Sequence, residues 1–225
     1  MKTASFILFV IGFSITSIAQ DLDKKYKSGT GAIYTMSMAG VSVEMGIVIG
    51  SITSNSMNVE YSFTQIIDGQ PQPLWQQFKM KNIPSSGFLV EEGYIQSNSM
   101  PKPEKLPKSY MQAYNSSLPM QSFLFGNKGS HQGQFLGNET VKTGAGNTKA
   151  QHYVTQSNGQ TIHYWISPEA MPTGLVKLVV TGNQGYEVLL KQLISNSPAK
   201  INPSQAIRLS EKTRKWLPQP GQGTM

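Results

Sequence analysis

The chain has 225 residues, a formal net charge of +7 and no cysteine. Without cysteine there are no disulfides, no thiolate metal ligands and no cysteine nucleophile. Charged residues make up only 14% of the chain and the positive ones are scattered, so the dense basic surface of a nucleic-acid-binding protein is not expected.

Residues 1–19 have the pattern of a cleavable secretory signal peptide. Lys2 gives a positive start, residues 4–15 are largely apolar, and Ser17 and Ala19 are the small residues that a signal peptidase recognises. The apolar run is too short to span a bilayer comfortably, and no later segment approaches the length of about 18 apolar residues that spanning requires. We therefore expect cleavage after Ala19 and a mature chain without a transmembrane segment. Its expected location is the bacterial periplasm or the exterior, where a cysteine-free domain is ordinary.

Three segments near the start of the mature chain alternate between apolar and polar residues. They are residues 31–38, 41–49 and 57–63. Alternation with a period of two is typical of a β-strand with one buried face. The links between them are short and rich in Gly, Ser and Asn, which predicts an antiparallel meander. Two further strands are expected, at about 74–82 and 88–94.

The apolar–polar alternation stops in the middle of the chain. Residues 97–108 contain three prolines and predict a loop. The segment 108–114 can form two turns of helix, because the preceding proline suits the first helical position. Tyr110 and Tyr114 would then lie on one side of that helix, at positions i and i+4.

The strongest local pattern is Asn158-Gly159, which lies between the alternating segments 151–155 and 161–166. An Asn-Gly pair favours a two-residue hairpin turn, because both residues tolerate positive φ. The expected opposite pairs are Ser157 with Gln160, Val154 with His163, Tyr153 with Tyr164 and His152 with Trp165.

A second hairpin is expected between residues 175–180 and 186–193. Asn202-Pro203 is then a good start for a C-terminal helix, since Asn caps well and Pro suits the first turn. The residues on one side of this helix would be Ala206, Leu209, Thr213 and Trp216. The sequence thus predicts a mainly β, antiparallel protein with a few short helices. It forms one domain over residues 20–217, followed by a flexible tail at 218–225.

Residues that carry chemistry form no recognisable catalytic motif. His152 and His163 would lie diagonally on one face of a hairpin and could share a metal ion, but no further ligand is placed near them. We therefore expect two structural histidines beside Trp165, with no metal or other cofactor. Glu91 and Glu92 are adjacent in a strand, so they should point to opposite faces rather than act together on one substrate.

The segment 162–178 resembles part of the periplasmic lipoprotein carriers of the LolA/LolB type, in which a strand ends in an acidic or proline-bearing turn and the next begins with a Gly-Leu-Val-Lys-like stretch. The similarity is strongest over residues 146–193 and looser over the leader and the meander. It implies a single antiparallel sheet curled into a half-barrel, with helices closing its concave side over an apolar cavity. It also implies binding of lipid moieties without catalysis.

The function expected from the sequence is that of an exported, non-enzymatic binding or carrier protein for a hydrophobic or lipid-like ligand. Ten of the eleven methionines follow the leader, and methionine adapts to ligands of varied shape. The candidate ligand-binding residues are Met36, Met38, Met45, Ile47, Met57, Tyr61, Tyr110, Met111, Tyr114 and Trp165. A filled core that contains these same methionines is the competing interpretation.

Two alternatives stay open. The first is a cell-envelope interaction module that docks on a partner protein or on the membrane surface through a basic C-terminal segment. Its candidate residues are Arg208, Lys212, Arg214, Lys215 and Trp216. The second is a hydrolase without a recognisable motif, which a deep pocket that holds His152 and His163 with a carboxylate in reach would favour.

Overall fold

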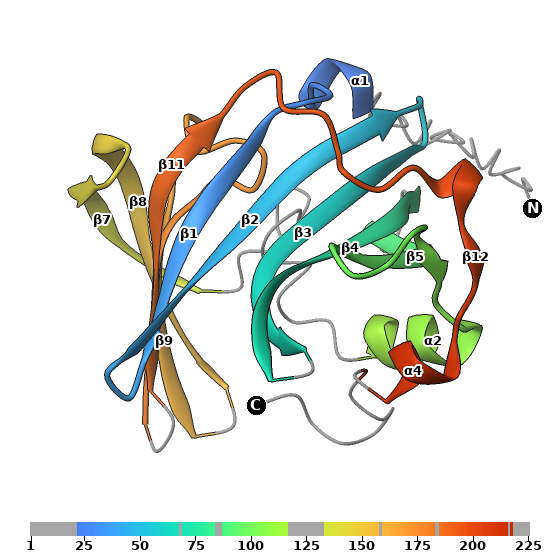
Figure 1. The fold of residues 1–225 in the computed structure, drawn as a ribbon. Helices are drawn as coiled ribbons and strands as arrows, with labels where there is room; N and C mark the ends of the chain where they lie inside the picture. Colours follow the sequence, from blue (N-terminus) through green and yellow to red (C-terminus); the bar gives the residue numbers. More distant parts are fainter. Residues whose placement is uncertain are drawn as a thin grey trace, which may run out of the picture.

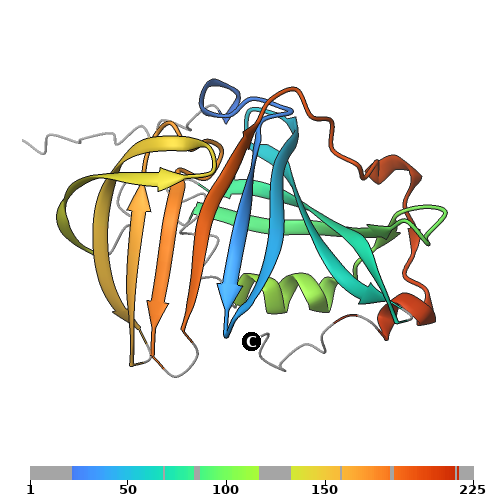
Figure 2. The ribbon, with the colours of Figure 1, turned by 60° about the vertical axis from the view of Figure 1, so that its left-hand side comes forward.

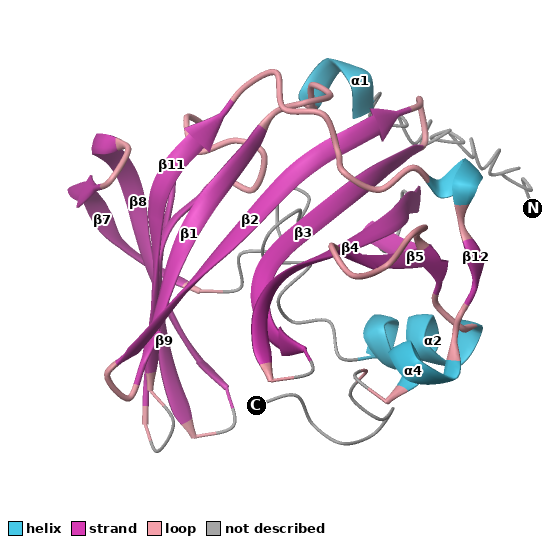
Figure 3. Cartoon of the chain, viewed as in Figure 1, coloured by secondary structure: helices cyan, strands magenta, loops and turns pink. Residues whose placement is uncertain are grey.

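The computed structural model describes residues 22–67, 69–83, 87–116, 133–157, 159–182, 185–215 and 217. The predicted leader, His131, Asn158, Trp216 and the predicted tail lie outside these residues. Within the described part, the protein is mainly β, with one sheet that is not closed and a few short helices (Figures 1 and 3). This confirms the predicted fold class.

Twelve strands of the described residues form the sheet, in the order β12-β6-β5-β4-β3-β2-β1-β11-β10-β9-β8-β7. Their bounds are β1 Gly31–Met38, β2 Val41–Ile52, β3 Ser56–Ile67, β4 Gln70–Ile83, β5 Gly87–Ser97, β6 Glu104–Lys105, β7 Gln134–Thr143, β8 Gly146–Ser157, β9 Gln160–Ile166, β10 Leu175–Thr181, β11 Tyr186–Ile194 and β12 Ile207–Arg208. Neighbouring strands are antiparallel, except that β12 runs parallel to β6. The helical elements are α1 Leu22–Lys25, α2 Lys108–Ser116, a 3₁₀ turn at Pro203–Gln205 and α4 Glu211–Arg214.

The predicted hairpin around residue 159 forms with the expected register. Ser157 pairs with Gln160, Tyr153 with Tyr164, and His152 with Trp165. Gly159 has φ +74°, the left-handed value that a two-residue turn requires. The local turn residues therefore suffice to set which side chains lie opposite one another in β8 and β9.

The C-terminal helix that Asn202-Pro203 was expected to start does not run on as one element. The Asn202 side chain caps Ser204 as predicted, but the 3₁₀ turn ends at Gln205, and Ala206 is extended. Ile207 then donates a backbone hydrogen bond to Pro103, and Ser210 donates one to the buried carboxylate of Glu104. These contacts with β6 replace one turn of helix, and α4 begins after Ser210.

Two segments cover the outer, convex face of the sheet. Residues 197–201, named here the C-terminal strap, cross β3 and β4, where Glu60 and Gln77 bind the strap backbone. The β7–β8 hairpin bends across the outer face at the other end (Figure 2). Its turn is held there by a hydrogen bond of 3.2 Å from the Gly144 N–H to the Leu190 carbonyl.

Candidate functional site

The inner, concave face of the sheet carries the apolar residues that the alternation predicted. Backbone pairing places Tyr34 opposite Met45, and Ala32 opposite Ile47. Ile47 in turn lies opposite Tyr61 on the next strand. Directly opposed residues of antiparallel strands point to the same face. Strands β1, β2 and β3 therefore present one continuous apolar inner surface.

One end of this inner face is packed solid. Its most deeply buried side chains are Tyr34, Ile47, Ile49, Met57, Val59, Phe78 and Met80, each with at most 1% of its surface exposed. A side chain lining a cavity that admits water would keep accessible surface, and these do not. Ile47 and Met57, which were expected to contact a ligand, thus belong to the packed core. Tyr61 is almost as deeply buried, with 8% exposed.

The other end of the same face, next to the turn between β1 and β2, is open. Met38 pairs with Val41, and Met36 pairs with Val43. Met38, Val41 and Val43 are 41%, 65% and 40% exposed, whereas Met36 and Met45 are half-buried. We name these five residues the open end. It contains three of the predicted ligand-binding methionines, together with two valines that the sequence analysis had assigned only to the buried strand face.

Helix α2 packs against the inner face of β5, as a lid over the concave side was expected to do. The Met111 side chain is buried against Gly93, where any side chain on residue 93 would come within 2.6 Å of the Met111 terminal methyl group. Tyr110 is half-buried, and burial raises the pKa of its phenol although a hydrogen bond to the Gln76 side chain lowers it. The Tyr114 side chain lies outside the described residues.

Asn115 fastens the end of α2 to the sheet. Its side-chain oxygen accepts a hydrogen bond of 2.9 Å from the Val90 N–H, and its amide donates one of 3.0 Å to the Val90 carbonyl. The ladder between β4 and β5 is interrupted beside Val90 by a register shift. Backbone groups released by a bulge need other partners. The position of α2 thus depends on an irregularity in β5.

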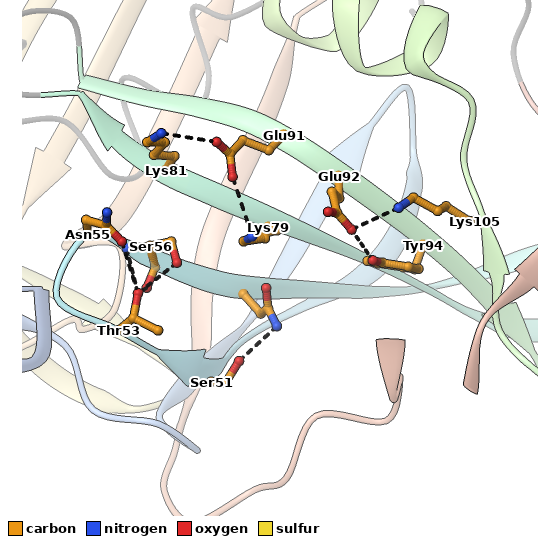
Figure 4. Close-up of polar contacts among 11 residues, drawn as sticks. Ser51, Thr53, Asn55, Ser56, Lys79, Lys81, Glu91, Glu92, Tyr94 and Lys105 are labelled. Atoms are coloured by element: carbon orange, nitrogen blue, oxygen red, sulfur yellow. Dashed lines mark hydrogen bonds and ion pairs between the residues drawn. The ribbon is translucent and has the colours of Figure 1, made fainter. Parts of the chain in front are cut away.

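The same irregularity changes the predicted placement of Glu91 and Glu92. Val90 opposes Met80 and Glu92 opposes Lys79, so Glu91 is the extra residue of a bulge. Glu91 makes ion pairs of 3.5 Å with both Lys79 and Lys81 (Figure 4). Because Lys79 also lies opposite Glu92, both carboxylates are on the outer face, and the expectation of opposite faces is wrong.

Glu92 is held by partners different from those of Glu91. Tyr94 donates a hydrogen bond to Glu92, and the Lys105 amine lies 3.1 Å from the same carboxylate oxygen (Figure 4). The hydrogen bond from Tyr94, followed by that from Lys105, lowers the pKa of the Glu92 carboxyl. Both glutamates therefore lie on the outer face in contact with lysine side chains.

Trp165 lies on the outer face of the sheet, away from the open end. Its neighbour Tyr164 points inward and is fully buried, so Trp165 points outward. The Trp165 indole stacks on the His152 ring, with centroids 4.1 Å apart and planes 17° apart. Trp165 therefore lies on the face opposite to that of the open end, and its predicted position opposite His152 is confirmed.

The two histidines beside Trp165 are connected to a carboxylate that the sequence did not place there. Glu139 on β7 accepts hydrogen bonds from His152 Nδ1 at 2.7 Å and from the Trp165 indole at 2.8 Å. His152 Nε2 lies 3.0 Å from His163 Nδ1. The Trp165 hydrogen bond, followed by that of His152, lowers the pKa of the Glu139 carboxyl. Strand β7 has little alternation, so sequence reasoning missed both the strand and its glutamate.

The basic residues of the C-terminal segment are all accessible. Arg208 on β12 and Lys212, Arg214 and Lys215 in and after α4 are exposed, while Arg214 makes an ion pair of 3.5 Å with Glu211. The segment is attached to the rest of the protein through the buried side chains of Leu209 and Thr213. The segment that carries these exposed basic side chains is therefore attached to the rest of the fold.

No group of three or more His, Asp or Glu side chains among the described residues is arranged to hold a metal ion. None of the helices there is long and apolar enough to cross a bilayer.

No protein-family model matches the chain, and no curated protein matches it. Among solved structures, the chain is similar to a protein described as a lipoprotein of Parabacteroides distasonis, with 13% identity and a TM-score of 0.35, covering 74% of this chain and 95% of that one. It is also similar to MucB of Pseudomonas aeruginosa in a MucA/MucB complex, with 10% identity and a TM-score of 0.45, covering 86% of this chain and 62% of that one. A third similar structure is a β-barrel-like protein from Brucella abortus that consists of a domain of unknown function, with 7% identity and a TM-score of 0.36, covering 76% of this chain and 99% of that one.

Proposed function

We propose that the chain is an exported, non-enzymatic binding protein that holds a hydrophobic, lipid-like ligand at the open end of its inner sheet face. The observation that carries the proposal is the pair of cross-strand contacts Met38–Val41 and Met36–Val43, which continue the core surface into solvent. Each Å² of apolar surface that a ligand removes from water contributes about 25 cal/mol of favourable free energy. A hydrophobic ligand that covers the contiguous apolar surface at the end of the core therefore gains binding free energy.

The composition of the open end also supports binding without chemistry. It consists of methionine and valine side chains, which carry no acid, base or nucleophile. Methionine is flexible and polarizable, and so fits acyl chains of varied shape. The resemblance to lipoprotein carriers of the LolA/LolB type agrees with this proposal, since it implies a curled sheet with a helix on its concave side. Export would follow from residues 1–19.

The test is binding of an environment-sensitive fatty-acid probe, combined with native mass spectrometry of the purified protein. We expect Val43→Asp to weaken probe binding at least tenfold, because a charge would lie where the chain of the ligand packs. The matched control is Leu89→Asp. Leu89 is 43% exposed, like Val43, but it lies opposite Lys81 on the outer face. Equal loss in both variants, or a wild-type protein that is empty and binds no probe, would refute the proposal.

A second candidate function rests on the exposed basic residues of the C-terminal segment, which suit an anionic membrane surface. Deleting this segment would also remove the buried side chains of Leu209 and Thr213, so charge reversal is the cleaner test. The combined change Arg208→Glu, Lys212→Glu and Lys215→Glu should abolish co-sedimentation with anionic vesicles. Reversal of the exposed Lys27, Lys142 and Lys149 is the control for net charge. Equal binding by both triple variants would exclude this function.

A further inference from the structure

The outer face of the sheet contains a polar cluster for which the proposed ligand-binding function has no use. It comprises Glu139, His152, His163 and Trp165, contributed by β7, β8 and β9. From its geometry we propose a second site, independent of the hydrophobic ligand, that binds a divalent transition-metal ion through His152 Nε2 and His163 Nδ1. Imidazole nitrogens are ligands suited to Cu²⁺ and Zn²⁺, and Cu²⁺ binds such sites more tightly.

The hydrogen bond to Glu139 determines which nitrogen of His152 is available to a metal. The Glu139 carboxylate accepts a hydrogen bond from His152 Nδ1 at 2.7 Å. A carboxylate in this position keeps the proton on Nδ1, which leaves the Nε2 lone pair for a metal. Histidines that bind zinc usually donate a hydrogen bond from their other ring nitrogen to a partner such as a carboxylate. This partner fixes the tautomer and the orientation of the ring.

The His152 ring is already held in place by its neighbours. Trp165 stacks on it at 4.1 Å, and the Trp165 indole donates to the other oxygen of Glu139 at 2.8 Å. Glu139 is thereby occupied at both oxygens, so it supports the histidine and does not itself act as a metal ligand. A ligand fixed before binding loses little conformational entropy when the metal arrives.

The two histidine nitrogens lie close to the separation that a shared metal ion requires. His152 Nε2 and His163 Nδ1 are 3.0 Å apart and face each other across β8 and β9. Two imidazole nitrogens bound to one tetrahedral zinc, at about 2.0–2.1 Å each, are about 3.3 Å apart. Conversion of the hydrogen bond into a chelate therefore requires a change of a few tenths of an ångström in this distance, together with a tilt of the two rings that makes their lone pairs converge on one point. The remaining positions are filled by water, since the described residues hold no third His, Asp or Glu placed as a ligand.

The proton balance is simple. In the neutral pair, His163 Nδ1–H donates to His152 Nε2. Metal binding moves this proton to His163 Nε2, so both ligating nitrogens present lone pairs and no proton is lost from the pair. The surrounding charge suits a cation, because the positive charge of Lys177 is balanced by Glu187 at 2.9 Å, whereas Glu139 adds a negative charge.

The test is titration of the purified protein, without a histidine tag, with CuCl₂ and then with ZnCl₂. Isothermal calorimetry should show saturable one-to-one binding, and Cu²⁺ should quench the fluorescence of Trp165. His163→Ala and the closer isostere His163→Gln should both abolish saturable binding. Glu139→Gln should weaken it about 10–100-fold, as second-shell changes do. Trp165→Phe should remove the fluorescence change but keep the calorimetric binding.

The control is His131→Ala, which removes the third histidine of the chain and should leave binding unchanged. Circular dichroism of each variant shows whether it is folded, and His163→Gln serves if His163→Ala is not. Three results would overturn the proposal: no saturable binding by the wild-type protein, unchanged binding in folded His163 variants, or loss of binding in His131→Ala.

Discussion

The Glu60 carboxylate lies 2.8 Å from the backbone nitrogen of Ile201, 141 residues further along the chain. The same carboxylate accepts a second hydrogen bond of 2.8 Å from the Lys200 N–H. Gln77 on β4 bridges the pair, since its amide donates to both Glu60 and the Ile201 carbonyl. Glu60 is only 4% exposed. One buried acid thus joins the strap to the outer face of the sheet.

Glu60→Ala should lower the free energy of unfolding by about 2–4 kcal/mol, because each buried N–H left without an acceptor costs about 1–3 kcal/mol. Chemical denaturation measures this loss. Glu44→Ala is the control, since Glu44 makes an exposed ion pair with Lys191, and such pairs contribute less than about 1 kcal/mol. If the two variants are destabilised equally, the strap contacts of Glu60 do not contribute as the geometry implies.

The stability should also depend on the protonation of Glu60. Burial raises the pKa of this carboxyl above its ordinary value of 4.5, although the hydrogen bonds from Lys200, Ile201 and Gln77 lower it. The folded state therefore holds the proton more tightly than the unfolded chain. This contribution is fully present below pH 4.5 and is lost as the pH rises through the folded-state pKa.

The experiment is a comparison of the wild-type protein with Glu60→Gln at a series of pH values. The free energy of unfolding of the wild type, minus that of the variant, should be larger at about pH 4 than at about pH 8. A difference that grows with rising pH would mean that the hydrogen bonds outweigh burial and that the folded-state pKa is lowered.

Strand β2 should respond very differently to truncation at its two ends. Ile49→Ala should cost about 2–5 kcal/mol, because Ile49 has no exposed surface and its removal leaves a cavity. Val41→Ala should change the stability by no more than about 0.5 kcal/mol, since Val41 is 65% exposed. Thermal or chemical unfolding of both variants checks this. A large loss in Val41→Ala would show that the open end is packed in solution.

The Tyr34 hydroxyl connects β1 with the loop before β10. It forms a hydrogen bond of 2.5 Å with the Thr173 hydroxyl and donates one of 3.1 Å to the Leu175 carbonyl. Burial raises the pKa of Tyr34 to about 12, so the phenol stays protonated at ordinary pH. A double-mutant cycle of Tyr34→Phe and Thr173→Val should give a coupling energy of about 0.5–1.5 kcal/mol. Additive losses would mean that the two hydroxyls do not interact.

Gly144 allows the β7–β8 turn to lie against β11. A β-carbon at this position would come within 2.5 Å of the Lys191 carbonyl oxygen, which belongs to the backbone and cannot rotate away. Gly144→Ala should therefore cost about 1–3 kcal/mol, as overpacking does. Ala145→Ser, at the exposed neighbouring position, should be nearly neutral. Unfolding measurements distinguish the two, and an equally neutral Gly144→Ala would argue against this close contact.

The sequence determined the features that depend on neighbours along the chain. Alternation placed the strands around residues 31–38, 41–49 and 57–63, because a one-sided sheet requires apolar side chains at every second position. The Asn-Gly turn set the register of β8 and β9, and so the position of His152 opposite Trp165. The helix after Pro107 followed from the same kind of local pattern.

Tertiary structure decided everything that joins distant segments. The bulge at Glu91, the pairing of Glu60 with the strap, the break in the C-terminal helix and the arrival of Glu139 beside His152 each involve partners that no local pattern identifies. The division of the inner face into a packed and an open end was settled in the same way. Alternation states which side of a strand is apolar, whereas burial depends on which segments reach that side, and this follows from how the whole sheet curves.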